Sequence, residues 1–363
     1  MLEQGRQAYL DRVRGIAVLV MIEAHVFDSW TLVSERKRHE FINLMVLGGF
    51  GAPLFLFLAG VSLVLSAESK YRKTGDLTQS WRAVQKRGWQ VLGLAFLFRL
   101  QSFILTAGYS PAGLLKVDIL NVMGPAIAFT AMAGERVKSR NTRAVVFAVL
   151  AAAIAMLTPI VRLTPLLNWL PDPLEWYFRP SPTRTNFTLF PWAGFVFAGA
   201  VAGTVVESMR RAEHPVRRQL ALAAASILLV AAGYRAAFLP SIYPQSEFWT
   251  SSPTFFLIRA GLISLVLPLA YLWERAPWRG MVSRWSPLEE FGRSSLFVYW
   301  VHVEMVYGVI AKPLKRNLSF QGAILAYVLF TAFILGLVLL KDRWVRLRKT
   351  GPLTAPRPTP ASI

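Results

Sequence analysis

The chain has 363 residues, of which 54% are hydrophobic and none is cysteine, and its formal net charge is +20. Its mean hydropathy is +0.43, and its apolar residues fall in repeated runs of about 18 or more, long enough to cross a bilayer. This composition predicts an integral membrane protein and excludes disulfides, thiolate metal sites and a cysteine nucleophile. No nucleic-acid partner is expected, because the basic residues occupy short loops between apolar runs and form no single polar face.

Taken in chain order, the apolar runs predict an all-α fold, a polytopic membrane helix bundle of about ten transmembrane helices. The predicted spans are residues 13–31, 42–66, 85–106, 114–134, 143–163, 188–208, 217–239, 254–274, 292–311 and 320–341. They form one transmembrane domain, residues 1–349. The Pro-rich segment 350–363 is expected to be a disordered cytoplasmic tail.

Basic residues gather in every second loop, as after the second and sixth predicted spans. The positive-inside rule then places both termini in the cytoplasm of a multi-pass protein of the cell (inner) membrane. A few basic residues instead fall near the outer ends of spans. Arg162, Arg235 and Arg259 are of this kind, and we expect them to snorkel to the interface.

The stretch 9–66, two predicted spans flanking a charged loop, carries the first candidates for chemistry. His25 and Asp28 lie three residues apart in the first span and therefore share one helical face. A charged side chain within a bilayer costs at least about 2.5 kcal/mol, so we expect this face to border a cavity. His39 lies in the loop, which the charge bias places on the outer side.

The ninth predicted span adds His302, followed closely by Glu304. Imidazole titrates near neutral pH, so His25, His39 and His302 are candidates for acid–base chemistry. The alternative is that these histidines hydrogen-bond neighbouring helices together. No metal site is predicted, because the sequence has no HExxH-like helix and offers too few convergent ligands.

Further polar groups lie around the loop between the third and fourth spans. Arg99 and Lys116 are separated by a charge-free loop and neighbour Gln101 and Asp118, so they are candidates to line a cavity. Two outer segments, 164–187 and 240–253, are rich in Pro, Trp and Tyr. They could form an interfacial aromatic belt or a platform on which a sugar ring stacks.

Three motifs carry a resemblance to a known family. They are Asp11-x-x-Arg14-Gly15; His39, fourteen residues before Pro53-x-Phe55-x-Phe57; and Gly292-x-x-Ser295-x-x-Val298-Tyr299-x-x-His302. With these motifs the chain resembles the membrane-bound acetyltransferases typified by heparan-α-glucosaminide N-acetyltransferase, together with their bacterial relatives. His25 stands where the family has a polar amide.

The resemblance implies an acyltransferase that moves an acetyl group from cytoplasmic acetyl-CoA to an amine or hydroxyl of a sugar on the outer side. It makes His39 the general base. His25 or Asp28 would orient His39 or hold the acceptor, and His302 would stabilise the oxyanion or carry a second proton. The transfer could be direct or pass through an acetyl-histidine.

Acetyl-CoA is then a co-substrate, and no permanently bound cofactor or metal is expected. The predicted partners are acetyl-CoA, a glycan or amino-sugar acceptor and the lipid bilayer; a homodimer is left open. The candidate substrate-binding residues are Asp11, Arg14, Arg99, Lys116, Asp118, Tyr299 and Glu304.

Other classes of protein remain open at this point. An O-acyltransferase of the broader ten-span superfamily would differ in its acceptor. A transporter or flippase would use intramembrane His, Asp and Arg residues to relay protons or bind an anion. Inverted repeats would favour a transporter, and the sequence shows none. A structural membrane subunit would not explain three histidines and an aspartate near the spans.

Overall fold

The computed structural model describes residues 7–105, 111–210, 212–276 and 285–349, and over these residues it consists of helices and loops without strands. This confirms the predicted all-α bundle. The predicted tail, residues 350–363, lies outside the described residues. The α-helices are α1 (Ala8–Trp30), α2 (His39–Gly48), α3 (Gly51–Thr74), α4 (Leu77–Leu105), α5 (Ile119–Arg136), α6 (Arg140–Leu163), α7 (Asp172–Glu175), α8 (Leu189–Met209), α9 (Pro215–Ala236), α10 (Pro253–Arg275), α11 (Pro287–Arg293), α12 (Ser295–Tyr307) and α13 (Phe320–Lys349).

Each predicted span coincides with a helix or with two consecutive helices. Seven helical segments of the described chain are long and apolar enough to cross a membrane, α2 and α3 together counting as one. The other helices at predicted spans are shorter or more polar: α12 has 13 residues, and α1 carries Arg14, Glu23 and Asp28 within its length. The membrane bundle is therefore confirmed, and the number of ten spans stays a prediction.

Two predicted spans have a different shape from the one expected. The second span begins as the short helix α2, so His39 starts a helix and does not lie within a loop. The ninth span is divided between α11 and α12, because Ser294 between them leaves the helical backbone conformation.

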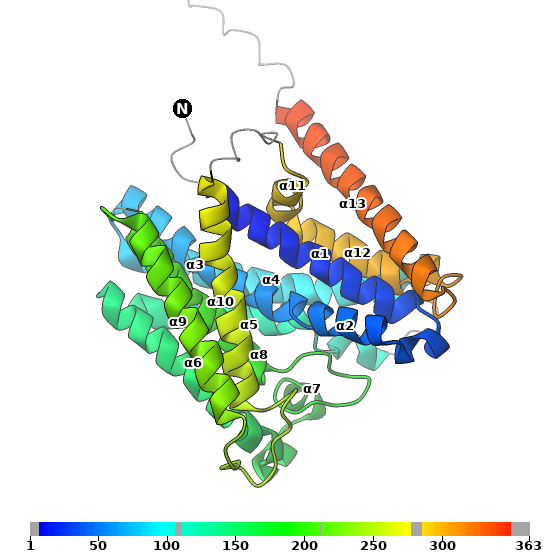
Figure 1. Ribbon diagram of the computed structural model, residues 1–363, viewed down its shortest axis with the longest axis horizontal. Helices are drawn as coiled ribbons and strands as arrows, with labels where there is room; N and C mark the ends of the chain where they lie inside the picture. The colour runs from blue at the N-terminus through cyan, green and yellow to red at the C-terminus, as the bar shows by residue number, and fades with distance from the viewer. Residues whose placement is uncertain (1–6, 106–110, 211, 277–284, 350–363) are drawn as a thin grey trace, which may run out of the picture.

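The helices form two groups, and α3 and α8 make up a central layer between them (Figure 1). Helix α1 packs against α11, α12 and α13, while α6 and α9 lie on the other side of the bundle; α10 packs along α9 and also contacts α1. The start of α1 and the ends of α10 and α13 lie at the top of Figure 1, and α7 lies at the bottom. The bundle therefore has two ends, one with the start of α1 and the other with α7.

The central layer is held by a close helix crossing. Helix α3 packs along α8, and a Cβ atom placed on Gly199 would lie only 1.9 Å from the carbonyl oxygen of Phe57. Helices in a bilayer associate through close contacts of small residues, since lipid is as apolar as their side chains. This crossing fixes two helices that contribute residues to the lining of a cavity, Ala52 from α3 and Trp192 from α8.

Candidate functional site

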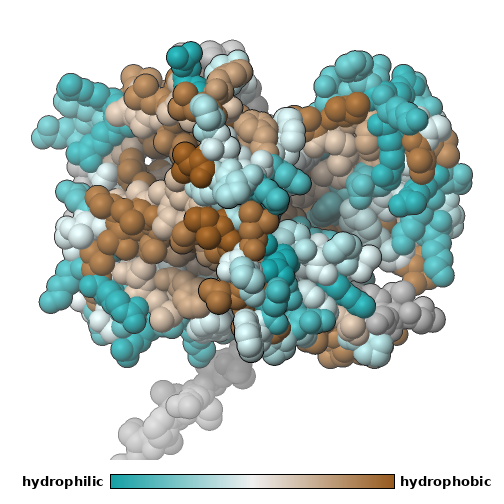
Figure 2. Space-filling model, turned by 90° about the horizontal axis from the view of Figure 1, so that it is seen from below, coloured by the Kyte–Doolittle hydropathy of each residue, from teal (hydrophilic) through white to brown (hydrophobic). Residues whose placement is uncertain are grey.

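A cavity of about 1480 Å³ opens between the two groups of helices. The lining comes from α1, α2, α3, α4, α5, α6, α8, α10 and α12, together with the loops before α5, α8 and α10. Seen from the side of α7, the surface is hollowed between two lobes (Figure 2). The charge bias of the loops predicts that this side is the outer one.

A pair of histidines lies at the α1 side of the cavity. His25 lines the cavity, and its Nδ1 atom is 3.0 Å from Nε2 of His302. The two rings are nearly parallel, with 16° between their planes. His302 is completely buried behind His25. Two helices far apart in the sequence, α1 and α12, therefore meet through these two side chains.

The hydrogen bonds of His302 determine where the protons of the pair lie. Nδ1 of His302 is 2.7 Å from the carbonyl oxygen of Val298. A carbonyl oxygen only accepts, so this Nδ1 carries a proton, and Nε2 of the neutral imidazole accepts from Nδ1–H of His25. The tautomer inferred for neutral His25 then leaves its Nε2 unprotonated. A lone pair on Nε2 is what a general base needs.

Asp28 lies one helical turn beyond His25 and also lines the cavity. The hydroxyl of Tyr307 donates to its Oδ2 at 3.2 Å, and Nη1 of Arg36 lies 3.6 Å from its Oδ1. The Tyr307 ring also packs edge-on against His25, with 5.4 Å between the ring centroids. The carboxylate is thus held near the histidine pair and remains exposed to the cavity.

Polar groups of α4, of α12 and of the loop before α5 continue this wall. The Arg99 guanidinium pairs with Asp118, whose carboxylate also caps α5. Ser102 donates to Oε1 of Glu304 at 2.6 Å. All four residues line the cavity, as does Lys116. Charged groups within a membrane protein are stable when paired in this way.

Two tyrosines, Tyr299 of α12 and Tyr177 of the segment before α8, support the same wall. Tyr299 lines the cavity, and its ring stacks on Phe55 at 6.3 Å between centroids. Tyr177, in the segment before α8, accepts a hydrogen bond from Nδ2 of Asn121 at 3.2 Å. Burial raises the pKa of the Tyr177 phenol, so the phenol stays neutral and holds this segment against the start of α5.

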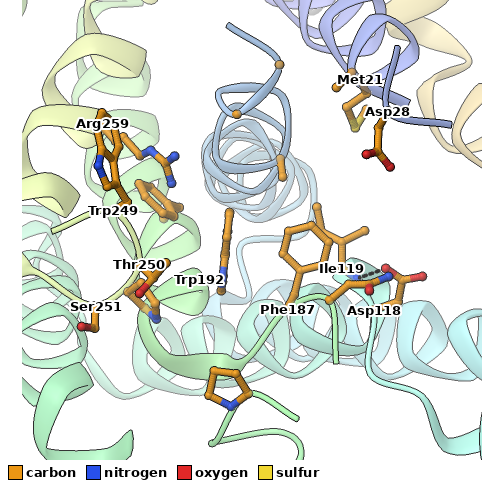
Figure 3. A pocket seen from close by; sticks show the side chains of 18 of the residues that line it. Met21, Asp28, Asp118, Ile119, Phe187, Trp192, Trp249, Thr250, Ser251 and Arg259 are labelled. Carbon is orange, nitrogen blue, oxygen red and sulfur yellow. Dashed lines mark hydrogen bonds between the residues drawn. The ribbon is translucent and has the colours of Figure 1, made fainter. Parts of the chain in front are cut away.

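The opposite wall is aromatic and cationic (Figure 3). Arg259 of α10 and Trp249 of the preceding loop lie together at one end of the cavity, and Asp28 and Met21 lie at the other. Arg162 also lines the cavity. Arg162 and Arg259, which we expected to snorkel to the interface, thus border the cavity. Arg235 is exposed at the end of α9, and its position at the interface stays a prediction.

Four predicted site residues lie outside the cavity lining: His302, which contacts His25 from behind, and His39, Asp11 and Arg14. His39 is exposed at the first residue of α2. Arg14 donates to Oδ1 of Asp11 at 2.6 Å, and a Cβ atom on Gly292 would lie 1.8 Å from the Asp11 carbonyl oxygen. Two of the motifs that carried the family resemblance therefore meet at a tight junction between α1 and α11, at the end of the bundle away from His25.

The structure brings together the other predicted site residues, which come from α1, α4 and α12 and from the loop before α5. Those lining the cavity are His25, Asp28, Arg99, Lys116, Asp118, Tyr299 and Glu304. His302 contacts His25 from behind. Sequence reasoning missed Tyr307, which donates to Asp28, and Ser102, which donates to Glu304. Neither residue carries a charge or belongs to a motif that would have marked it. Over the described residues, no three His, Asp or Glu side chains converge on a point where a metal ion could bind.

The protein is thus a multi-pass membrane bundle in which one histidine of a hydrogen-bonded pair lines a large cavity together with several carboxylates, as in an enzyme active site. Its family follows from comparison with known proteins. The family model described as heparan-alpha-glucosaminide N-acetyltransferase, catalytic, matches residues 6–243, and the chain belongs to this family. It is therefore a membrane acetyltransferase in general terms. A search of curated proteins found no match. The family match includes His25 and Asp28 and ends before α10, so Arg259 and His302 lie beyond it.

Proposed function

We propose that this protein transfers an acetyl group from cytoplasmic acetyl-CoA to an amine or hydroxyl of a sugar bound in the cavity, with His25 as the general base. The observation that carries the proposal is the hydrogen-bonded chain from His25 through His302 to the carbonyl oxygen of Val298. This chain leaves Nε2 of His25 unprotonated at a residue that lines the cavity.

The reaction forms a C–N or C–O bond and breaks the C–S bond of the thioester. Nε2 of His25 takes the proton of the acceptor as its nitrogen or oxygen attacks the acetyl carbonyl, and returns that proton to the departing thiolate. The protonated ring keeps its hydrogen bond to His302, which is a positioning residue. General base catalysis of this kind contributes about 10²–10⁴-fold in rate.

The carboxylates of the same wall suit the acceptor. Asp28 and Glu304 border the cavity close to the histidine pair, and each can accept a hydrogen bond from a sugar hydroxyl or ammonium. Arg99, Lys116 and Asp118 lie beside them. We assign the acceptor to this cavity because its volume exceeds the roughly 300–1,000 Å³ of ordinary small-molecule sites.

The proposed base differs from the one that the family resemblance implies. The side chain of His39 is exposed and does not line the cavity, so a role for it requires the start of α2 to move. We therefore propose His25 in place of His39 as the base, and comparison of His25→Ala with His39→Ala decides between the two assignments. The substrate contacts of Asp11 and Arg14 stay predictions. The alternative to direct transfer is an acetyl-histidine intermediate. In that route the acetyl group would be attached to Nε2 of His25, and acid quenching during turnover would trap the acetylated protein.

The test uses purified protein in proteoliposomes, with radiolabelled acetyl-CoA supplied on the side of the termini and glucosamine on the other side. We expect acceptor-dependent transfer by the wild type and its loss, by at least about 100-fold, in His25→Ala. Thermal unfolding of the variant controls for misfolding. If the wild type neither binds nor consumes acetyl-CoA, the enzyme proposal fails and the transporter becomes the better account.

A further inference from the structure

Helix α2 is a loosely held part of the cavity wall. Only Phe41 and Gly48 of its ten residues are buried, while Met45 and Gly48 border the cavity. Phe41 packs with Phe27 and Phe320 in a small hydrophobic cluster that is separate from the main core. A segment with few buried apolar contacts opens at a low cost in free energy. The wall on this side of the cavity therefore depends on few contacts.

A carboxyl group without a partner lies beneath the end of α2. Glu23 of α1 is only 5% exposed, and a Cβ atom placed on Gly48 would lie 3.2 Å from its Oε2 atom. Within the described residues, neither carboxyl oxygen of Glu23 has a hydrogen-bond partner. A buried carboxyl that lacks partners costs free energy, whether it is charged or neutral. The contact between α1 and the end of α2 therefore contains a destabilising group.

The junction between α2 and α3 permits α2 to move by itself. Helix α2 ends at Gly48 and α3 begins at Gly51, so only Gly49 and Phe50 separate the two helices. Hinge movements are absorbed by a few residues at the ends of helices, and glycine restricts the backbone least. Movement of α2 away from α1 would let water reach Glu23 and supply the missing hydrogen bonds.

We propose that α2 is a hinged flap on the cavity, which rotates away from α1 about Gly49, and that the unpartnered carboxyl of Glu23 keeps its docked position only marginally stable. The open flap exposes Glu23 to water and widens the cavity beside Met45. Helix α3 stays in place, because it packs along α8. The movement itself does not depend on the proposed function. The inference that the flap governs entry of the acceptor to His25 rests on that function.

The test measures the distance between two spin labels on the full-length protein in nanodiscs. The chain has no cysteine, so labels attach only to introduced cysteines. One pair joins Ile42→Cys on α2 to Leu228→Cys on α9, two positions with exposed side chains. We expect two distances, one for the docked and one for the open flap. Glu23→Met should lower the ratio of open to docked flap by at least about tenfold, because an apolar side chain of similar length needs no partner. Phe41→Ala should raise the ratio, because it removes a buried contact of α2.

Two controls accompany these variants. Glu40→Met replaces an exposed carboxylate on the same helix and should leave the ratio unchanged. A label pair at Leu228→Cys and Leu329→Cys, on α9 and α13, should give one distance in every variant, since neither helix belongs to the flap. The movement is refuted if the first pair gives a single distance in the wild type, if Glu23→Met leaves the ratio unchanged, or if Glu40→Met lowers it as much.

The role of the flap in acceptor entry is tested by turnover. If only the open flap admits glucosamine, kcat/KM for glucosamine should fall in Glu23→Met by the same factor as the ratio of open to docked flap. An unchanged kcat/KM beside a lowered ratio would overturn this role. Absence of acetyl transfer by a wild type whose flap still moves would refute the enzyme proposal alone.

Discussion

At the scale of single residues, the protein sets the state of its proposed base through a backbone carbonyl. Val298 lies one turn before His302 on α12, and its carbonyl oxygen accepts from Nδ1 of His302. This contact fixes one tautomer of His302, and His302 in turn fixes the tautomer of His25. His302 therefore acts through His25, without touching the cavity.

A substitution at residue 302 should separate positioning from binding. We expect His302→Ala to lower kcat by about 10–100-fold, because His25 loses the acceptor that holds its Nδ1–H. The KM for the acceptor should change little, since His302 does not line the cavity. His302→Gln should recover part of kcat, because its side-chain carbonyl can accept from His25. A rise in KM at constant kcat would contradict this role.

At the scale of helices, α3 and α6 are joined by a buried ion cluster at the end away from the cavity mouth. Both oxygens of Glu68 accept at 2.7 Å, one from Arg143 and one from Arg140. The Arg143 side chain is only 1% exposed, although it is the first residue of the predicted span 143–163. Arg143 lies over the Trp81 ring at 4.9 Å, so the cluster ties three helices together.

Breaking this cluster should destabilise the bundle. We expect Glu68→Gln to lower the free energy of unfolding by about 3 kcal/mol, because it leaves Arg143 buried without its counter-charge. The matched control is Arg82→Gln, which breaks the exposed pair with Glu135 and should cost at most about 1 kcal/mol. Thermal unfolding in detergent measures both. Equal effects of the two substitutions would show that the buried pair contributes no more than the exposed one.

At the scale of the whole molecule, the orientation in the membrane follows from the loop charges. The chain has no cysteine, so single introduced cysteines can be labelled without background. We expect Trp169→Cys, in the exposed segment before α7, to react with a membrane-impermeant maleimide in intact cells. His214→Cys, before α9, should react only after the membrane is permeabilised. The reverse pattern would invert the predicted topology.

The sequence predicts the helical bundle well, because each span is a long apolar run whose length is set by the bilayer. It also marks most of the cavity wall: His25, Asp28 and Glu304 stand out as polar residues within apolar runs. It does not reveal which of them meet, since the contact between His25 and His302 joins residues 277 positions apart. Arg259 looked like an interfacial residue, because the sequence does not show that its side of α10 lines the cavity.

The central claim is that the base is the histidine at the cavity and not the one at the exposed start of α2. The most direct measurement is turnover of radiolabelled acetyl-CoA, with glucosamine as acceptor, by wild type, His25→Ala and His39→Ala at equal amounts of folded protein. We predict that His25→Ala loses at least about 100-fold of the acceptor-dependent rate and that His39→Ala stays within a few-fold of wild type. Loss of activity in His39→Ala with activity retained in His25→Ala would contradict the account.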